Sequence, residues 1–144
     1  MASTPQTSTA STNSLSAPTR SRSTIVGVVI SVLVGLFLAF DVAGKFARPQ
    51  AVIDGTRDLG FPDHQTYVMG AVLLIGLILF AIPRTAVLGA VALTGYLGGA
   101  VTANMRIEAP LLSTTLFAVY LGVAMWIGLV LRRPELLKVA GLRS

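Results

Sequence analysis

Six polar residues in or beside apolar segments of this chain have side chains suited to binding a ligand or forming an ion pair. They are Asp41, Lys45, Thr94, Tyr96, Asn104 and Arg106. Asp41 precedes Lys45 by four positions, the spacing at which an acid and a base on one helical face can pair. An ionisable residue inside a membrane segment is a functional candidate by default. These six residues are therefore the predicted candidate ligand or ion-pair site.

Two interpretations of this set stay open. In the first, the residues form the mouth of a helix bundle that binds an anionic or quinone-like head group, with Lys45 and Arg106 as donors and Asp41 orienting them. Thr94 and Tyr96 would then lie deeper in the bundle. In the second, the charges form a belt at the membrane surface with a structural bridge from Asp41 to Arg106. Both interpretations predict that Asp41 is paired with Lys45, with Arg106 or with both.

The residue types exclude several kinds of chemistry. The chain has no cysteine, so disulfide exchange, thiolate catalysis and Cys-ligated metal centres are excluded. Its single histidine, His64, excludes an intrinsic bis-histidine haem site. We find no complete catalytic set, so we predict no catalytic residue, no metal ligand and no cofactor held by the chain itself. A quinone is the one cofactor left as a hypothesis.

The composition is that of a membrane protein. Of 144 residues, 53% are hydrophobic and 12% are charged, and the mean hydropathy is +0.77, whereas soluble domains carry about 25% charged residues. The net charge of +5 could suggest a nucleic-acid partner. The basic residues, however, flank apolar segments instead of gathering with aromatics on one face. We therefore predict the lipid bilayer as partner and no nucleic acid.

The apolar segments predict an all-α membrane protein, a four-transmembrane-helix bundle. Nineteen residues from Thr85 to Ala103 contain no ionisable group at neutral pH, and they would cover roughly the 30 Å of a hydrocarbon core. The four predicted spans are residues 24–44, 64–82, 85–104 and 113–131. Between the first two spans, Pro49 and the apolar spacing that follows predict a short amphipathic helix in the membrane interface.

The ends of the chain differ from this 24–133 membrane domain. Residues 1–23 are rich in Ser and Thr and contain no acid, so we expect a disordered tail. The tail and the apolar run after it resemble targeting segments, but that run is longer than a usual signal-peptide core and no convincing cleavage site follows it. Residues 134–144 form a short basic tail.

The charges in the loops predict an orientation. Four spans place both termini and the Pro83–Thr85 turn on one side, with seven basic residues against four on the other. Since basic residues are retained in the cytoplasm, we expect both termini to be cytoplasmic in a multi-pass protein of the bacterial cell membrane.

Small residues recur every fourth position in the first and third predicted spans. With lipid as the solvent, helices associate through close contacts that small residues permit. We therefore predict that Gly35 or Ala39 packs directly on Gly95, Gly98 or Gly99. Gly98→Leu should then disrupt the bundle, whereas leucine at Val91 should be tolerated. The second span has no evident ridge of this kind and is expected to supply bulk.

Several motifs together resemble the DoxX-like proteins over residues 23–137. The motifs are Asp41-x-x-x-Lys45, Leu59-Gly60-Phe61-Pro62, Pro83 to Ala90, Leu93 to Ala100 with Arg106 beyond it, and Tyr120 to Arg132. The resemblance implies a four-helix integral membrane protein. Some DoxX relatives are subunits of quinone-linked or thiol-linked redox assemblies.

The function expected from these observations is that of a non-catalytic membrane subunit or anchor associated with a redox or quinone-linked assembly. Its partner would be an oxidoreductase subunit or a second copy of the chain. The alternatives are a small transporter or a lipid- or quinone-binding membrane protein. An enzyme acting on a lipid or quinone, with Asp41 as the base, is a further hypothesis.

Overall fold

The computed structural model of the chain describes residues 22–139 and residue 141. The predicted disordered tail, residues 1–23, lies outside these residues except for Arg22 and Ser23, which are already helical. Within the described part, every regular element is a helix. In chain order they are α1 (Arg22–Ala47), α2 (Gln50–Asp58), α3 (Gln65–Ala81), α4 (Ala86–Arg106), the π-helical turn η1 (Leu111–Thr115), α5 (Leu116–Arg132) and α6 (Glu135–Val139).

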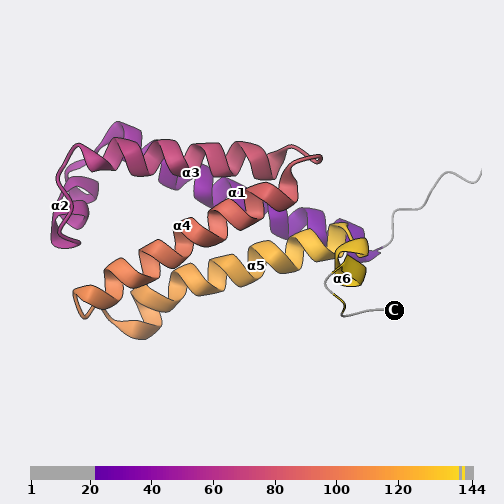
Figure 1. The fold of residues 1–144 in the computed structure, drawn as a ribbon. Helices are drawn as coiled ribbons and strands as arrows, with labels where there is room; N and C mark the ends of the chain where they lie inside the picture. The colour runs from indigo at the N-terminus through magenta and orange to yellow at the C-terminus, as the bar shows by residue number, and fades with distance from the viewer. Residues whose placement is uncertain (1–21, 140, 142–144) are drawn as a thin grey trace, which may run out of the picture.

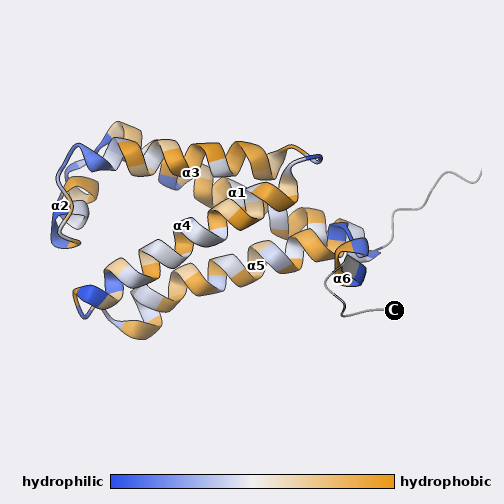
Figure 2. Ribbon diagram, viewed as in Figure 1, coloured by the Kyte–Doolittle hydropathy of each residue, from blue (hydrophilic) through white to orange (hydrophobic). Residues whose placement is uncertain are grey.

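Four of these helices run along the length of the molecule, with α2 at one end and α6 at the other (Figure 1). Among the described residues, three helical stretches are long and apolar enough to cross a membrane. They are α1, α4 and the 22 residues from Leu111 to Arg132, which consist of η1 and α5. The fourth, α3, is apolar but has only 17 residues. Hydrophobic residues cover the middle of the molecule, and the polar residues gather at its two ends (Figure 2).

The long helices pack in neighbouring pairs. α1 packs against α3 and α5, and α4 packs against the same two helices. The side chains enclosed between them are mostly aliphatic, and the largest that are fully buried include Leu38, Leu73, Leu93, Met125 and Leu129. The buried core therefore lies among all four long helices.

The predicted contact between the small residues of α1 and α4 is wrong. A Cβ placed on Gly95, Gly98 or Gly99 would have no heavy atom within 4 Å, and one on Gly35 would only just reach Leu77 of α3. Ala39, the other α1 candidate, is exposed. The glycines of the third predicted span therefore do not hold α1.

The small residues of α1 instead meet α5. A Cβ on Gly27 would lie 2.7 Å from Cβ of Leu131, and a Cβ on Gly128 would lie 2.7 Å from Oγ of Ser31. Gly27, Ser31 and Gly128 are all buried. The ridge on α1 is thus used for close packing, as its spacing indicated, but its partner is the last long helix.

The second predicted span has no small residue at every fourth position, as expected, but two of its glycines still make close contacts. Gly70 and Gly76 of α3 are buried, and a Cβ on Gly76 would lie 2.8 Å from Cδ2 of Leu93. In α4, a Cβ on Gly89 would meet the backbone of Phe80. Since α3 has neighbours on two sides, it needs small residues to let both approach.

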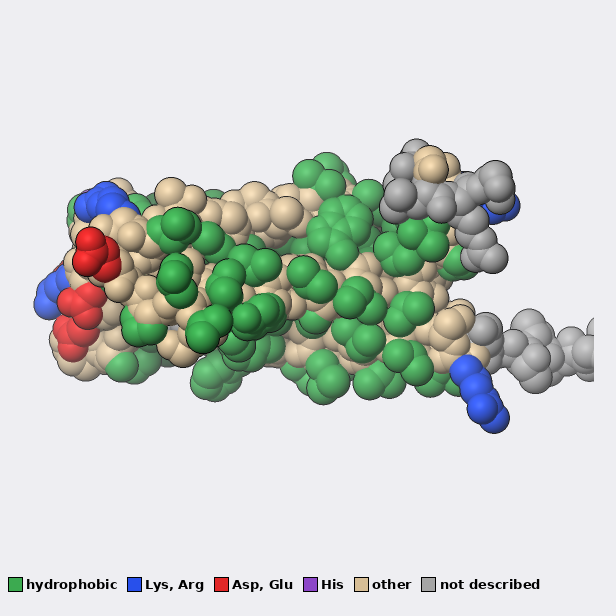
Figure 3. Space-filling model, turned by 90° about the horizontal axis from the view of Figure 1, so that it is seen from below, with side chains coloured by type: hydrophobic (Ala, Val, Ile, Leu, Met, Phe, Trp, Pro, Cys, Tyr) green, Lys and Arg blue, Asp and Glu red, His purple; other side chains and the backbone are tan. Residues whose placement is uncertain are grey.

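Charge is distributed unevenly between the two ends. The described residues at the α6 end carry one acid, Glu135, and five bases: Arg22, Arg84, Arg132, Arg133 and Lys138. The α2 end carries five acids, Asp41, Asp54, Asp58, Asp63 and Glu108, with four bases, Lys45, Arg48, Arg57 and Arg106. Acidic side chains accordingly appear only at the α2 end of the face in Figure 3.

Candidate functional site

The ion pair predicted near the end of the first span is present. Lys45 Nζ donates to Asp41 Oδ1 at 2.6 Å. The Lys45 side chain is only 16% exposed and that of Asp41 is 39% exposed, so the pair is partly shielded from solvent. Gly70 makes room for it, because a Cβ there would lie 3.1 Å from Cβ of Lys45. The pairing of Asp41 with Lys45 is therefore confirmed, whereas no ion pair joins Asp41 to Arg106 in the described part of the chain.

A cavity of about 960 Å³ opens beside this ion pair. Its walls come from α1, α2, α4, the segment after α4 and the start of α5, with Met69 from α3. Four of the six predicted site residues line it: Asp41, Lys45, Tyr96 and Asn104. Most of the remaining wall is apolar. These four residues thus lie at one cavity, and their role as a ligand site stays a prediction.

The other two predicted residues lie elsewhere. Thr94 accepts a hydrogen bond from Nε1 of Trp126 at 2.9 Å, in a separate apolar groove of about 400 Å³ between α4 and α5. Arg106 is exposed, and its guanidinium lies against Gly60, whose φ of +80° suits glycine. Thr94 and Tyr96 are two positions apart, so they point to different faces of one helix. Only Tyr96 faces the cavity.

Glycine makes part of the cavity wall. Gly95 and Gly99 are one helical turn apart on the same face of α4, and both line the cavity. No heavy atom lies within 4 Å of a Cβ placed on either. Gly98, the adjacent residue, lines the Trp126 groove instead. Two of the glycines predicted to pack helices therefore leave space for the cavity.

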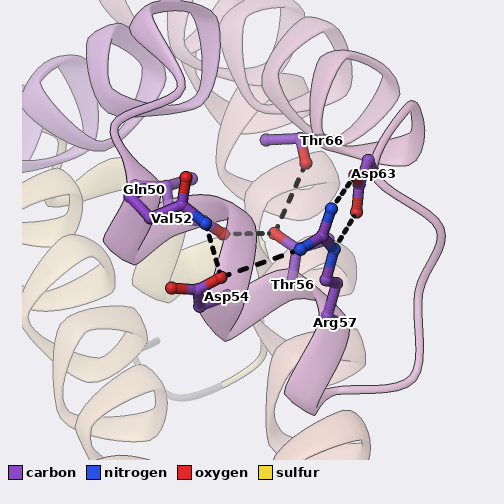
Figure 4. Close-up of polar contacts among 7 residues, drawn as sticks. All are labelled: Gln50, Val52, Asp54, Thr56, Arg57, Asp63 and Thr66. Atoms are coloured by element: carbon purple, nitrogen blue, oxygen red, sulfur yellow. Dashed lines mark hydrogen bonds and ion pairs between the residues drawn. The ribbon is translucent and has the colours of Figure 1, made fainter.

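Helix α2 and the residue after it line one end of the cavity through side chains that include Val52, Thr56 and Leu59. Buried Thr66 donates to the hydroxyl of Thr56 at 3.4 Å, and Thr56 donates to the carbonyl of Val52 at 2.7 Å (Figure 4). The first of these bonds joins α2 to the first turn of α3, and the second lies within α2.

A surface ion pair fixes the loop after α2. Arg57 Nε donates to Asp63 Oδ1 at 2.6 Å (Figure 4). This hydrogen bond lowers the pKa of Asp63 and, with the attraction between the two charges, raises the pKa of Arg57. Neither residue lines the cavity. The pair therefore holds α2 in place without contacting an occupant.

The residues that line the cavity all lie within the part of the chain that matches a known family. Residues 29–128 match the DoxX-like family, which is more than half of the chain. The chain belongs to the DoxX-like family. Its apolar helices and this membership make it a transmembrane protein. Neither the search of curated proteins nor the search of solved structures finds a match.

In this DoxX-like protein, sequence reasoning missed the contribution of α2 to the site. Thr56 and Asp58 line the cavity from α2. The amphipathic pattern of residues 49–59 was the available signal, but it does not say which surface the helix covers. Within the described residues, no group of three His, Asp or Glu side chains is placed to hold a metal ion.

Proposed function

We propose that this DoxX-like protein is a non-catalytic membrane protein that binds one amphiphilic molecule inside its helix bundle. The observation that carries the proposal is the cavity of about 960 Å³ beside the Asp41–Lys45 pair. Small-molecule sites occupy about 300–1,000 Å³ and combine apolar walls with a few polar groups. An amphiphile would place its polar group at the ion pair and its apolar body along α4 and α5.

The bundle is proposed to cross the membrane four times, with α3 as the second span. Its 17 residues contain no charge and would extend about 26 Å, near the lower limit for a spanning helix. α3 packs between α1 and α4. In this arrangement α2 lies in the membrane interface over the cavity.

The uneven charge of the two ends supports the predicted orientation. The α6 end, which has five bases and one acid among the described residues, is proposed to face the cytoplasm together with both termini. The cavity would then open on the opposite side of a bacterial cell membrane.

The position of the cavity favours binding over transport. Its lining residues lie between the middle of the bundle and its α2 end. The other half is closed by the contacts of Gly27 with Leu131 and of Gly76 with Leu93. A transporter needs access from both sides. A membrane subunit of a redox or quinone-linked assembly, with an oxidoreductase or a second copy as partner, needs access from one side only, and a quinone is one candidate occupant.

Two neighbouring glycines provide the test. Gly99→Phe would place a ring in the cavity, whereas Gly98→Phe places the same ring in the Trp126 groove. Each protein would be purified in mild detergent, and its organic extract would be analysed by mass spectrometry. We expect an amphiphile that co-purifies with the natural chain and with Gly98→Phe but not with Gly99→Phe. The same extract from all three proteins would contradict the proposal.

A further inference from the structure

We propose that the polar group of the bound amphiphile is a cation, as in a long-chain amine, and not the anionic head group that Lys45 and Arg106 suggested. This inference rests on the proposed binding function and concerns the same cavity. Four charged side chains line the cavity. Three of them are the carboxylates of Asp41, Asp58 and Glu108, and the fourth is the ammonium of Lys45.

The single ammonium in the cavity is already used. Lys45 Nζ donates to Asp41 Oδ1 at 2.6 Å, so this acid and base offset each other. Asp58 and Glu108 have no ion pair and no side-chain hydrogen bond in the described part of the chain. The cavity therefore keeps two uncompensated carboxylates at its rim.

The other bases at this end lie outside the cavity. Arg57 is bonded to Asp63, the Arg48 guanidinium lies 4.9 Å from the centre of the Tyr67 ring, and that of Arg106 lies against Gly60. None of the three arginines lines the cavity. Because Asp41 and Lys45 offset each other, the charge left on the lining is negative, and a concave site with apolar walls then attracts a cation.

The hydrogen-bonding groups favour the same ligand. Asn104 Nδ2 donates to the carbonyl of Ala100 at 2.8 Å, which leaves its Oδ1 as an acceptor. The Thr56 hydroxyl donates its hydrogen bond to the carbonyl of Val52. The acceptors at this wall that are free for a ligand include Asn104 Oδ1 and the carboxylates of Asp58 and Glu108. An ammonium brings three donors and no acceptor, so it can bond to these oxygens.

The walls also decide between an inorganic and an organic cation. No set of three His, Asp or Glu side chains in the described residues is placed to hold a metal ion. The cavity wall includes the rings of Phe37 and Phe117, which pack edge to face with centroids 5.3 Å apart. Apolar surface and aromatic faces accept an alkyl body and the charge of an organic ammonium. The occupant is therefore an apolar organic cation.

Three ten-carbon probes differ only in the polar group: decylamine, decanol and decanoic acid. They would be titrated at pH 7 into the full chain in nanodiscs of zwitterionic lipid, and binding to Gly99→Phe nanodiscs would be subtracted. At this pH the amine is a cation, the alcohol is neutral and the acid is an anion. We expect decylamine to bind at least roughly tenfold more tightly than decanoic acid, as a charge-assisted hydrogen bond allows.

Charge variants test whether Asp58 and Glu108 bind the amine. Asp58→Asn combined with Glu108→Gln should weaken decylamine roughly tenfold, the loss expected for a charged hydrogen bond, and should leave decanol unchanged. Asp54→Asn is the matched control, because Asp54 lies on α2 but does not line the cavity. Unchanged thermal unfolding of each variant would show that the bundle is intact.

The outcomes separate the two proposals. If decanol or decanoic acid binds as tightly as decylamine and Gly99→Phe abolishes the binding, the cavity binds amphiphiles but the cation proposal is wrong. Equal decylamine affinity in the Asp58 and Glu108 double variant would also overturn it. If no probe depends on Gly99, the binding function itself fails.

Discussion

The close crossing of α1 and α5 predicts that one added methyl group will have opposite effects at two glycines. At Gly27, a Cβ would lie 2.7 Å from Cβ of Leu131, 2.9 Å from the backbone N of Arg132 and 2.9 Å from the carbonyl O of Gly128. Two of these atoms belong to the backbone of another helix and can move only if the helices separate. At Gly98, a Cβ would meet nothing within 4 Å.

The magnitudes follow from these surroundings. Overpacking a well-packed contact costs about 1–3 kcal/mol, and replacing a helical glycine by alanine gains about 0.5–1 kcal/mol. Gly27→Ala should therefore destabilise the bundle by about 1–2 kcal/mol, because packing dominates. Gly98→Ala should be neutral or stabilising by up to about 1 kcal/mol, because only the helix propensity changes.

Both variants can be unfolded reversibly in mixed micelles, with the fluorescence of the single tryptophan, Trp126, as the signal. The reasoning predicts a lower midpoint for Gly27→Ala and an equal or higher one for Gly98→Ala. It would be refuted if Gly27→Ala were as stable as the natural chain, or if Gly98→Ala were the weaker of the two.

Three further predictions concern polar contacts. Lys45→Met should cost about 1–3 kcal/mol because it leaves Asp41 partly buried and unpaired, and adding Asp41→Asn should recover part of that loss in a double-mutant cycle. Because a hydrogen bond lowers the pKa of Asp63, its stabilisation of α2 is fully present above the unfolded value of about 3.9 and is lost as pH falls through the lowered pKa. Hydrogen exchange of α2 in the natural chain and in Asp63→Asn should thus differ at neutral pH and converge in acid; a constant difference would count against it. Thr94→Val should change the emission of Trp126 by removing its acceptor, whereas an unchanged spectrum would contradict that bond.

Much of the fold follows from local sequence. Three of the predicted spans agree with α1, α4 and the η1–α5 stretch to within a few residues at each end, because apolar runs and breakers such as Pro83 act locally. The remaining one, residues 64–82, coincides with the shorter apolar helix α3. The Asp41–Lys45 pair was predictable for the same reason, since both partners lie on one helical face.

The choice of neighbouring helices did not follow from local sequence. Small residues at period four show that α1 has a face for close packing, but Gly27 and Ser31 meet Gly128, one hundred residues away. The ridge on α4 looked equally suitable by depth in the membrane. Which ridge is used depends on how all four helices assemble, and a single helix does not encode that information.

The cavity was predictable only in part. Asp41, Lys45, Tyr96 and Asn104 marked its polar wall, whereas Gly95 and Gly99 looked like packing residues. A glycine permits close approach or leaves a space, and only the position of the next helix decides between the two. The contribution of α2 to the cavity wall was missed for the same reason.

The central claim, that the bundle holds a cavity reached from the α2 end, can be tested by thiol labelling. The natural chain has no cysteine, so Gly99→Cys and Gly98→Cys each introduce one thiol on neighbouring positions of α4. A membrane-impermeant methanethiosulfonate reagent needs water and a thiolate to react. In intact membranes we predict rapid labelling of Gly99→Cys, slowed by decylamine, and little labelling of Gly98→Cys. Equal, slow labelling of both thiols would contradict the account.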